Sequence, residues 1–367
     1  DVVTSMARIR VSAVDSIFYA INSRDFGVTR DDIVLTVDQL DFSVCQNDSV
    51  STSFVYETAT RFTDIASFSV ANSPVGLDVA FDPSSASATD TNVNVTFSAS
   101  ATLEPNVYPL DVMAVSPIRS QSVRYNIKAF STDFDLVTLA SPQDATIIDR
   151  LVTTLQWDYQ SNAERYLVEV ATDENFANIF YTTTVDNNSA LVRGLTGTTD
   201  YYWRVAPQNF CGNGDTGDVY RFTTPDQVAA LDLPVIISDD EPSTVTSIIT
   251  VEDNLRITDV NVFLTLSHTW VQDLSVTLTS PSGTSVNLLS NSCSDGDNID
   301  VVFDNEGGEL VCAVTNPSIS GRVRSQGDNL SRFNEQSSQG DWVLSVSDNY
   351  AEDGGSVDYV ALEIATD

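Results

Sequence analysis

The side chains whose types and spacing best suit metal binding are acidic residues in Asn- and Gly-rich stretches near the C-terminal end. One group lies in residues 303–308, and another in residues 348–353. Calcium takes about six to eight oxygen ligands, and loops of this composition supply them, although the spacing does not match an EF-hand loop. Two interpretations are open: solvated turn residues, which we favour, or a structural calcium ion near Asp273, Asp304 and Glu306. The candidate ligands are Asp273, Asp304, Glu306, Asp348 and Asp353.

The chain contains one histidine, His268, and this limits the catalytic chemistry it can perform. A zinc peptidase needs an HExxH-like pair, and serine or cysteine triads would all have to use this same residue. No GxSxG, GxxxxGK[ST] or GxGxxG motif is present. Carboxylate pairs for glycoside hydrolysis exist among 52 acidic residues, but no feature marks one. We predict that the chain is not an enzyme.

The chain has four cysteines, and their pairing bears on the compartment in which the protein works. None is arranged in a CxxC motif, so we do not expect a structural zinc site. Cys293 and Cys312 lie close together within one predicted domain, so we expect a disulfide and an oxidising compartment. Cys45 and Cys211 fall in different predicted domains. They are either two buried thiols or a bridge between domains, and we favour the buried thiols.

The formal net charge of −35, from 52 acidic and 17 basic residues, excludes several partners. Nucleic acids and anionic membranes bind Lys/Arg patches, which this chain lacks, so we expect neither as a partner. No apolar run approaches the ~18 residues of a membrane span. Because 42% of the residues are hydrophobic, the chain can still build cores, and the acidic surface keeps it soluble.

Short alternating strands separated by polar turns predict an all-β fold of several domains over the 367 residues. In residues 32–135, Val93, Val95 and Phe97 share one face of such a strand, which favours an Ig-like sandwich. Residues 1–31 carry strand patterns, one of them at 16–21, but too few to bury a core. We interpret them as the last strands of a truncated preceding domain plus a linker.

The open strand edges expected in residues 1–30 could pair with a second subunit, so self-association is a further expectation. The sequence opens at Asp1 directly into strand-like residues, without a signal peptide. We therefore expect a processed or excised piece of a longer chain.

Residues 136–226 resemble a bacterial fibronectin type III domain. The resemblance rests on an early Trp157, on Leu195 six residues before Tyr201, and on Trp203 in a Trp-Arg-Val strand. It implies that Trp157, Tyr201 and Trp203 are structural. The two tryptophans could form a ligand platform, but we expect them to pack in the core.

Residues 227–367 carry an ordered set of motifs that resembles the P domain of subtilisin-type proprotein convertases. In order these are His268, Asp273-Leu274, Ser280-Pro281-Ser282-Gly283-Thr284, the run Gly340-Asp341-Trp342-Val343-Leu344-Ser345-Val346-Ser347-Asp348, and Asp353-Gly354-Gly355. The resemblance implies a jelly-roll β-sandwich in which His268 and Trp342 are structural. The fold class expected for the chain is therefore tandem Ig-like and fibronectin type III-like sandwiches followed by a jelly-roll P domain.

The P-domain resemblance also implies a function, because in convertases this domain follows the catalytic domain and stabilises it. Residues 7–11 and the order of the modules resemble the C-terminal region of secreted Bacteroidetes metallopeptidases, which commonly use type IX secretion. We expect a secreted or cell-surface accessory region whose partners are its own upstream catalytic domain or other extracellular proteins. The alternative is an adhesion or surface-assembly protein. Carbohydrate binding by the jelly roll is a third class, supported by the fold alone.

Overall fold

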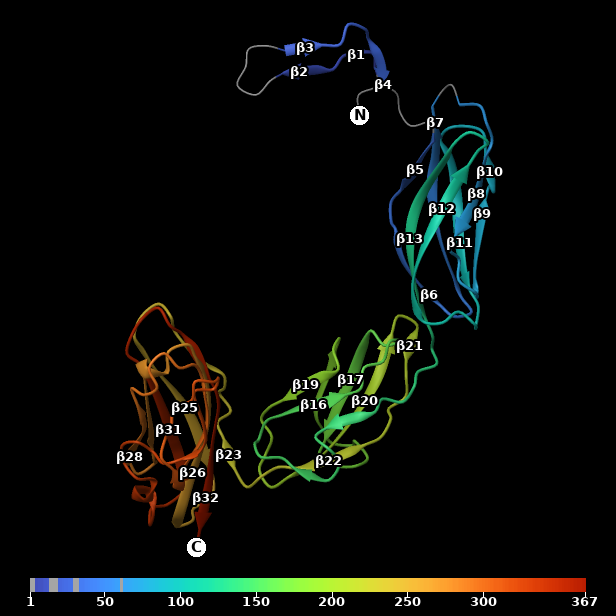
Figure 1. Ribbon diagram of the computed structural model, residues 1–367. Helices are drawn as coiled ribbons and strands as arrows, with labels where there is room; N and C mark the ends of the chain where they lie inside the picture. Colours follow the sequence, from blue (N-terminus) through green and yellow to red (C-terminus); the bar gives the residue numbers. More distant parts are fainter. Residues whose placement is uncertain (1–3, 13–18, 29–32, 60–61) are drawn as a thin grey trace. The chain divides into compact units, whose positions relative to one another are not determined.

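The computed structural model describes residues 4–12, 19–28, 33–59 and 62–367 (Figure 1). Regular structure in these residues is almost entirely β-strand, with two short 3-10 turns, η1 (Val271–Asp273) and η2 (Leu330–Phe333). The predicted all-β fold of tandem sandwiches is confirmed. The chain divides into two compact units, one of Asp1–Val137, Tyr159–Leu167 and Ala206–Gly217, the other of Thr138–Asp158, Val168–Val205 and Asp218–Asp367.

The N-terminal segment of the first unit forms two small antiparallel ribbons. Strand β1 (Thr4–Ala7) pairs with β4 (Phe26–Val28), and β2 (Arg10–Ser12) pairs with β3 (Tyr19–Ile21). Part of the strand predicted at residues 16–21 and the end of the predicted linker lie outside the described residues.

A first sandwich follows, in which two sheets face each other across one hydrophobic core. The sheet orders are β5-β7-β11-β9 and β10-β8-β12-β13-β6. Val93, Val95 and Phe97 point into this core and are fully buried, as their alternation predicts. The strands are β5 (Ile33–Val37), β6 (Asp41–Cys45), β7 (Ser49–Thr58), β8 (Ala66–Ala71), β9 (Leu77–Asp82), β10 (Ser85–Ala86), β11 (Thr91–Ala99), β12 (Asn106–Val115) and β13 (Ser120–Phe130).

The second sandwich has the sheet orders β14-β16-β19 and β15-β22-β20-β17-β18, with β21 paired to β20. Trp157 and Trp203 are buried, so they do not form an exposed platform. The Tyr201 hydroxyl accepts a hydrogen bond of 3.0 Å from the Thr196 N–H, as in a tyrosine corner. The strands are β14 (Leu139–Ser141), β15 (Thr146–Ile147), β16 (Thr153–Trp157), β17 (Arg165–Ala171), β18 (Ile179–Val185), β19 (Ser189–Val192), β20 (Asp200–Asn209), β21 (Gly212–Asn213) and β22 (Tyr220–Thr223).

The third sandwich contains the largest core. Its sheets have the orders β23-β32-β26-β29-β30, with β24 on β32, and β25-β31-β27-β28. Trp342 is buried between them, and its indole N–H donates to the Ser338 carbonyl at 2.9 Å. The strands are β23 (Val228–Ala229), β24 (Val235–Ile237), β25 (Ser243–Val251), β26 (Ile257–His268), β27 (Leu274–Thr279), β28 (Ser285–Ser290), β29 (Ile299–Gly308), β30 (Ile319–Val323), β31 (Gly340–Asp348) and β32 (Gly355–Thr366).

Two local predictions for the third sandwich can be checked directly. Residues 280–283 form the expected tight turn, in which the Gly283 N–H donates to the Ser280 carbonyl at 2.9 Å. Gly283 has a φ of +86°, which glycine tolerates without steric cost. Cys293 and Cys312 form the expected disulfide, with Cα atoms 5.2 Å apart. The domain boundaries at residues 31, 135 and 226 stay a prediction.

Candidate functional site

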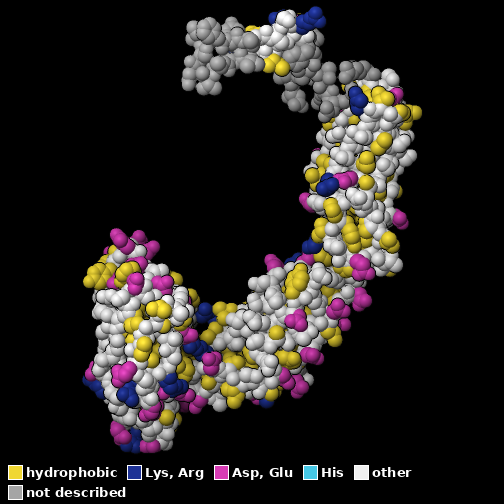
Figure 2. Space-filling model, in the orientation of Figure 1, with side chains coloured by type: hydrophobic (Ala, Val, Ile, Leu, Met, Phe, Trp, Pro, Cys, Tyr) yellow, Lys and Arg dark blue, Asp and Glu magenta, His cyan; other side chains and the backbone are white. Residues whose placement is uncertain are grey.

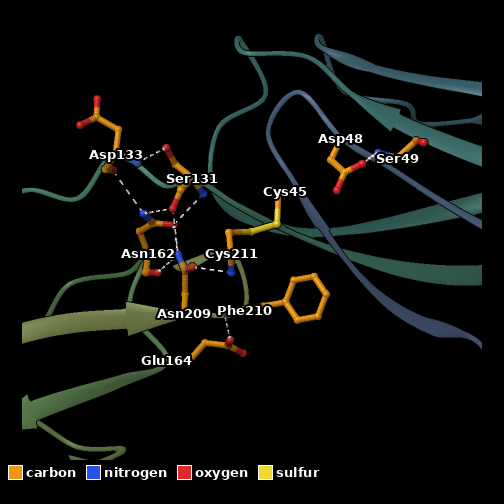
Figure 3. The surroundings of a disulfide bond; sticks show 10 residues. All are labelled: Cys45, Asp48, Ser49, Ser131, Asp133, Asn162, Glu164, Asn209, Phe210 and Cys211. Atoms are coloured by element: carbon orange, nitrogen blue, oxygen red, sulfur yellow. Dashed lines mark hydrogen bonds between the residues drawn. A yellow bond between two sulfur atoms is a disulfide. The ribbon is translucent and has the colours of Figure 1, made fainter. Parts of the chain in front are cut away.

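Cys45 and Cys211 form a disulfide bond, with Cα atoms 5.6 Å apart (Figure 3). Cys45 ends β6, and Cys211 lies in the turn between β20 and β21. The expectation of two buried thiols is therefore wrong: both side chains are partly exposed, and the described part of the chain has no free cysteine. The strand end and the turn meet in space although 166 residues separate the two cysteines in sequence.

The amide side chains of Asn162 and Asn209 hold the turn that carries Cys211 (Figure 3). The Ser131 N–H donates to Asn162 Oδ1 and Asn162 Nδ2 donates to the Ser131 carbonyl, both at 2.9 Å. Asn209 Nδ2 donates to the carbonyls of Ser131 and Asn162, each at 2.9 Å. Asn209 Oδ1 accepts from the Cys211 N–H at 2.8 Å. Since Ser131 directly follows β13, the network ties this turn to the end of that strand.

An ion pair also helps to hold the turn that carries Cys211. Lys128 Nζ lies 2.9 Å from Glu164 Oε1, and Glu164 Oε2 accepts the Phe210 N–H at 2.8 Å. The Lys128 and Glu164 side chains are 44% and 29% exposed, so their attraction is screened and modest. The disulfide, the amide network and this ion pair together are called the Cys45–Cys211 joint.

A second polar contact lies within the second unit and is centred on Tyr359 of β32. Its hydroxyl accepts the Leu151 N–H at 2.9 Å and donates to Gln227 Oε1 at 2.8 Å. Gln227 Nε2 in turn donates to the Asp149 carbonyl at 3.0 Å. Burial raises the pKa of Tyr359 to about 12, so the phenol stays neutral and keeps its donor hydrogen. These residues form the Tyr359 joint, which links the 149–151 loop to the third sandwich.

Replacing Tyr359 by phenylalanine is expected to lower the free energy of unfolding of the second unit by about 1–3 kcal/mol. The change leaves the Leu151 N–H and the Gln227 side chain without their hydrogen-bond partner. Urea denaturation followed by tryptophan fluorescence measures the effect. Tyr350→Phe is the matched control, because Tyr350 is 61% exposed. Equal midpoints for both variants would contradict a structural role for the Tyr359 hydroxyl.

The structure separates the five predicted calcium ligands into two groups. Asp304, which is 4% exposed, accepts the Glu306 N–H at 2.7 Å and pairs with the Arg322 guanidinium. Burial raises the pKa of Asp304, but hydrogen bonds from Arg322 and Glu306 outweigh it and leave the pKa below its ordinary value. The hydrogen bond with the Asp304 carboxylate raises the pKa of Glu306. Arg322 thus already supplies a cation to Asp304.

The other three acids lie at the opposite end of the same sandwich. Phe303 pairs with Val262, so Asp304 lies beside Asn261, about 23 Å along β26 from His268 at 3.3 Å per residue. One ion cannot reach both groups. Among residues 33–59, 62–367 and the described N-terminal strands, no three His, Cys, Asp or Glu side chains are grouped to hold a metal ion. Asp304 and Glu306 thus lie apart from Asp273, Asp348 and Asp353, and calcium binding stays a prediction.

His268 and Asp348 form a pair whose side chains are both fully buried. His268 Nε2 lies 3.1 Å from Asp348 Oδ2, and its Nδ1 lies 3.1 Å from the backbone N and O of Trp270. Asp348 Oδ1 also accepts the Tyr350 N–H at 3.2 Å. Both ring nitrogens of the histidine are therefore engaged inside the third sandwich. This arrangement joins the end of β26 to the end of β31.

Asp273 lies beside this pair and is only 8% exposed. Its backbone carbonyl accepts two hydrogen bonds from Asn349, but no described residue forms a hydrogen bond or ion pair with its carboxylate. Burial raises the pKa of Asp273, and the charges of Asp348 and Asp353 raise it further, against a smaller opposite effect of His268. Among the described residues, no lysine or arginine pairs with Asp273, Asp348 or Asp353, and His268 is the partner of Asp348.

Asp273→Asn is expected to raise the Tm of the third sandwich near neutral pH. Because the folded-state pKa lies above the ordinary value of 3.8, the charged carboxylate costs stability at any pH above it. The Tm difference between variant and parent should shrink as the pH falls through this region and Asp273 takes up its proton. Calorimetry between about pH 3 and 7 measures it. Asp253→Asn, at an exposed position, is the control and should show no such convergence.

The fold and these geometries can now be compared with known proteins. Residues 257–364 match the family model of the proprotein convertase P-domain, which covers the third sandwich from β26 to β32. No curated protein matches this chain. The third sandwich is therefore called the P domain below.

Solved structures of several modular proteins are similar to this chain at low sequence identity. A titin fragment has a TM-score of 0.32 at 13% identity, over 55% of this chain and 68% of that chain. The FN1–FN3 domains of chicken CNTN1 have a TM-score of 0.27 at 10% identity, over 91% and 97%. Fibronectin(III)-like modules of Clostridium thermocellum CbhA have a TM-score of 0.26 at 8% identity, over 53% and 94%. The P-domain match is the comparison that bears on function.

A search for membrane-spanning helices finds none of sufficient length and apolarity in the part of the chain that the structure describes.

Proposed function

We propose that this chain is a non-catalytic, extracellular accessory region of a secreted peptidase, whose P domain stabilises or positions the catalytic domain or binds protein partners. The P-domain match at residues 257–364 carries the proposal. Two disulfides support an oxidising location. His268 supports a non-catalytic role, because both of its ring nitrogens are occupied within its own fold. The finer assignment, to a Bacteroidetes metallopeptidase exported by type IX secretion, rests on residues 7–11 and the module order.

The test compares the natural secreted gene product, in full length, with a variant that lacks residues 227–367. Peptidase activity on a casein substrate and the Tm of the catalytic part are measured for both. We expect peptidase activity in the full-length product and a lower Tm or yield of active enzyme after the deletion. A full-length product without peptidase activity would overturn the proposal and favour the adhesion alternative.

Self-association through the N-terminal ribbons is a second candidate, which fits a surface-assembly protein. Met6 and Ile21 are 72% and 47% exposed on two-stranded sheets, and Ile9, between β1 and β2, is 59% exposed. Residues 1–30 also carry four arginines against three aspartates, in a chain of 52 acidic and 17 basic residues. Their charge is thus complementary to the acidic remainder of a second copy.

Sedimentation velocity of the chain with and without residues 1–30 tests this candidate. We expect the chain to associate in a concentration-dependent way. The association should require residues 1–30 and should weaken as the salt concentration rises. A monomer at all concentrations, or equal association of both forms, would show that the ribbons do not mediate self-association.

A further inference from the structure

Five segments meet at the end of the P domain where β26 and β31 finish. The Val271 N–H donates to the Gly296 carbonyl, and the Glu352 N–H donates to the Asp239 carbonyl, both at 2.9 Å. Asn298 Nδ2 donates to Asn316 Oδ1 at 2.9 Å. We call this surface the acidic end. It consists of residues 239–241, 268–273, 293–298, 311–318 and 348–354.

The acidic end holds nine carboxylates and no lysine or arginine. The four arginines of the P domain all form ion pairs with acids outside the acidic end. The pairs are Arg256 with Glu335 and Asp367, Arg322 with Asp304, Arg324 with Glu309, and Arg332 with Asp328. The domain therefore provides no lysine or arginine that could neutralise this surface.

Apolar side chains are exposed on the same surface. Trp270 is 42% exposed and Tyr350 is 61% exposed, and Val311 and Val314 are at least 72% exposed. Figure 2 shows hydrophobic and acidic side chains together at the end of this module remote from the C-terminus. A cavity of about 590 Å³ opens there, lined by residues 293–297 and 312–316 and by Ser318. Exposed aromatic residues beside charges of one sign are typical of protein-binding surfaces.

The missing element on this surface is a positive charge. Asp273 is 8% exposed, and its carboxylate has no hydrogen-bond or ion-pair partner among the described residues. It lies close to the carboxylates of Asp348 and Asp353, of which Asp348 pairs with the His268 ring. An uncompensated buried carboxylate is costly, and a cation from a ligand would relieve that cost.

We propose that the acidic end binds a basic segment of a partner polypeptide, with a lysine or arginine side chain pairing with Asp273 and Asp353 beside Trp270. The exposed Trp270 ring offers a cation–π contact to the same side chain, and Val311 and Val314 offer apolar contacts next to the cavity. The inference rests on the proposed function, since it names the partner class of an accessory P domain.

The experiment titrates the intact chain with an unlabelled deca-arginine peptide at about 0.15 M salt and records tryptophan emission. The other three tryptophans, Trp157, Trp203 and Trp342, are fully buried, so a change in emission reports on Trp270. We expect a saturable change that is absent in Trp270→Phe. Asp273→Asn combined with Asp353→Asn should weaken binding at least about tenfold, because two charged contacts are lost.

A matched control removes the same charge at the opposite end of the domain. Glu252→Gln combined with Asp253→Asn, at exposed positions beyond β25, should change the affinity less than about twofold. Equal weakening by both double variants, or an emission change that persists in Trp270→Phe, would overturn the proposal. Calcium that raises the Tm without peptide and blocks peptide binding would also overturn it, because the surface would then be a metal site.

The outcome is distinguishable from that of the proposed function. If deleting residues 227–367 impairs the full-length peptidase while deca-arginine fails to distinguish the two double variants, the accessory role stands and the basic-partner inference fails. If the full-length product has no peptidase activity, the accessory role fails whatever the peptide shows.

Discussion

Replacing His268 by alanine is expected to lower the free energy of unfolding of the P domain by about 3–5 kcal/mol. The histidine is the partner of Asp348, and both side chains are fully buried. Without it the Asp348 carboxylate remains inside the sandwich next to Asp273, with one backbone hydrogen bond from Tyr350. A domain of this size should lose about 10 °C or more in Tm, which calorimetry of the intact chain resolves.

The matched comparison is the double variant His268→Ala with Asp348→Ala. Removing both partners also removes the uncompensated charge, so the double variant should be less destabilised than the sum of the single changes. A coupling energy below about 0.5 kcal/mol, or a His268→Ala variant as stable as the parent, would show that the pair does not stabilise this end of the fold.

Replacing both Cys45 and Cys211 by serine is expected to have the second large effect. The bond closes a loop across 166 residues, and removing such a bond costs about 2–5 kcal/mol of unfolding free energy. The thermal transition of the first unit should fall by about 10 °C. The amide network of Asn162 and Asn209 should then fray, because the turn that it holds is no longer fixed covalently.

Serine at Cys293 and Cys312 is the comparison for this result. That bond closes a loop of only 19 residues within the P domain, so its loss should affect the P-domain transition and leave the first unit unchanged. If the Cys45–Cys211 double variant melts like the parent in calorimetry, the joint does not contribute to stability.

Side-chain periodicity accounts for most of the fold that could be predicted. The alternation of Val93, Val95 and Phe97 placed a strand and its buried face correctly, because strand geometry is local. The motif around Trp342 predicted the P domain, and the family match at residues 257–364 agrees. The disulfide between Cys293 and Cys312 was predicted because both residues lie in one domain, where sequence distance is a fair guide to spatial distance.

Contacts between distant loops were not predicted, since nothing local encodes them. Cys45 and Cys211 lie in different predicted domains, and their meeting depends on how β6 and the β20–β21 turn are brought together. In the sequence, Asn162 and Asn209 resemble ordinary turn residues, and Tyr359 resembles any other residue of an alternating strand. The calcium prediction grouped Asp304 with Asp273 because both are loop acids, whereas the register of β26 and β29 keeps them apart.

The Cys45–Cys211 bond also bears on how the protein withstands proteolysis. A peptidase that cuts one exposed loop between residues 45 and 211 divides the backbone into two pieces, yet the bond keeps both pieces in one molecule. Such nicked protein would migrate as an intact chain without reductant and as two fragments with it. The protein thereby tolerates a break over a stretch that includes most of its first two sandwiches.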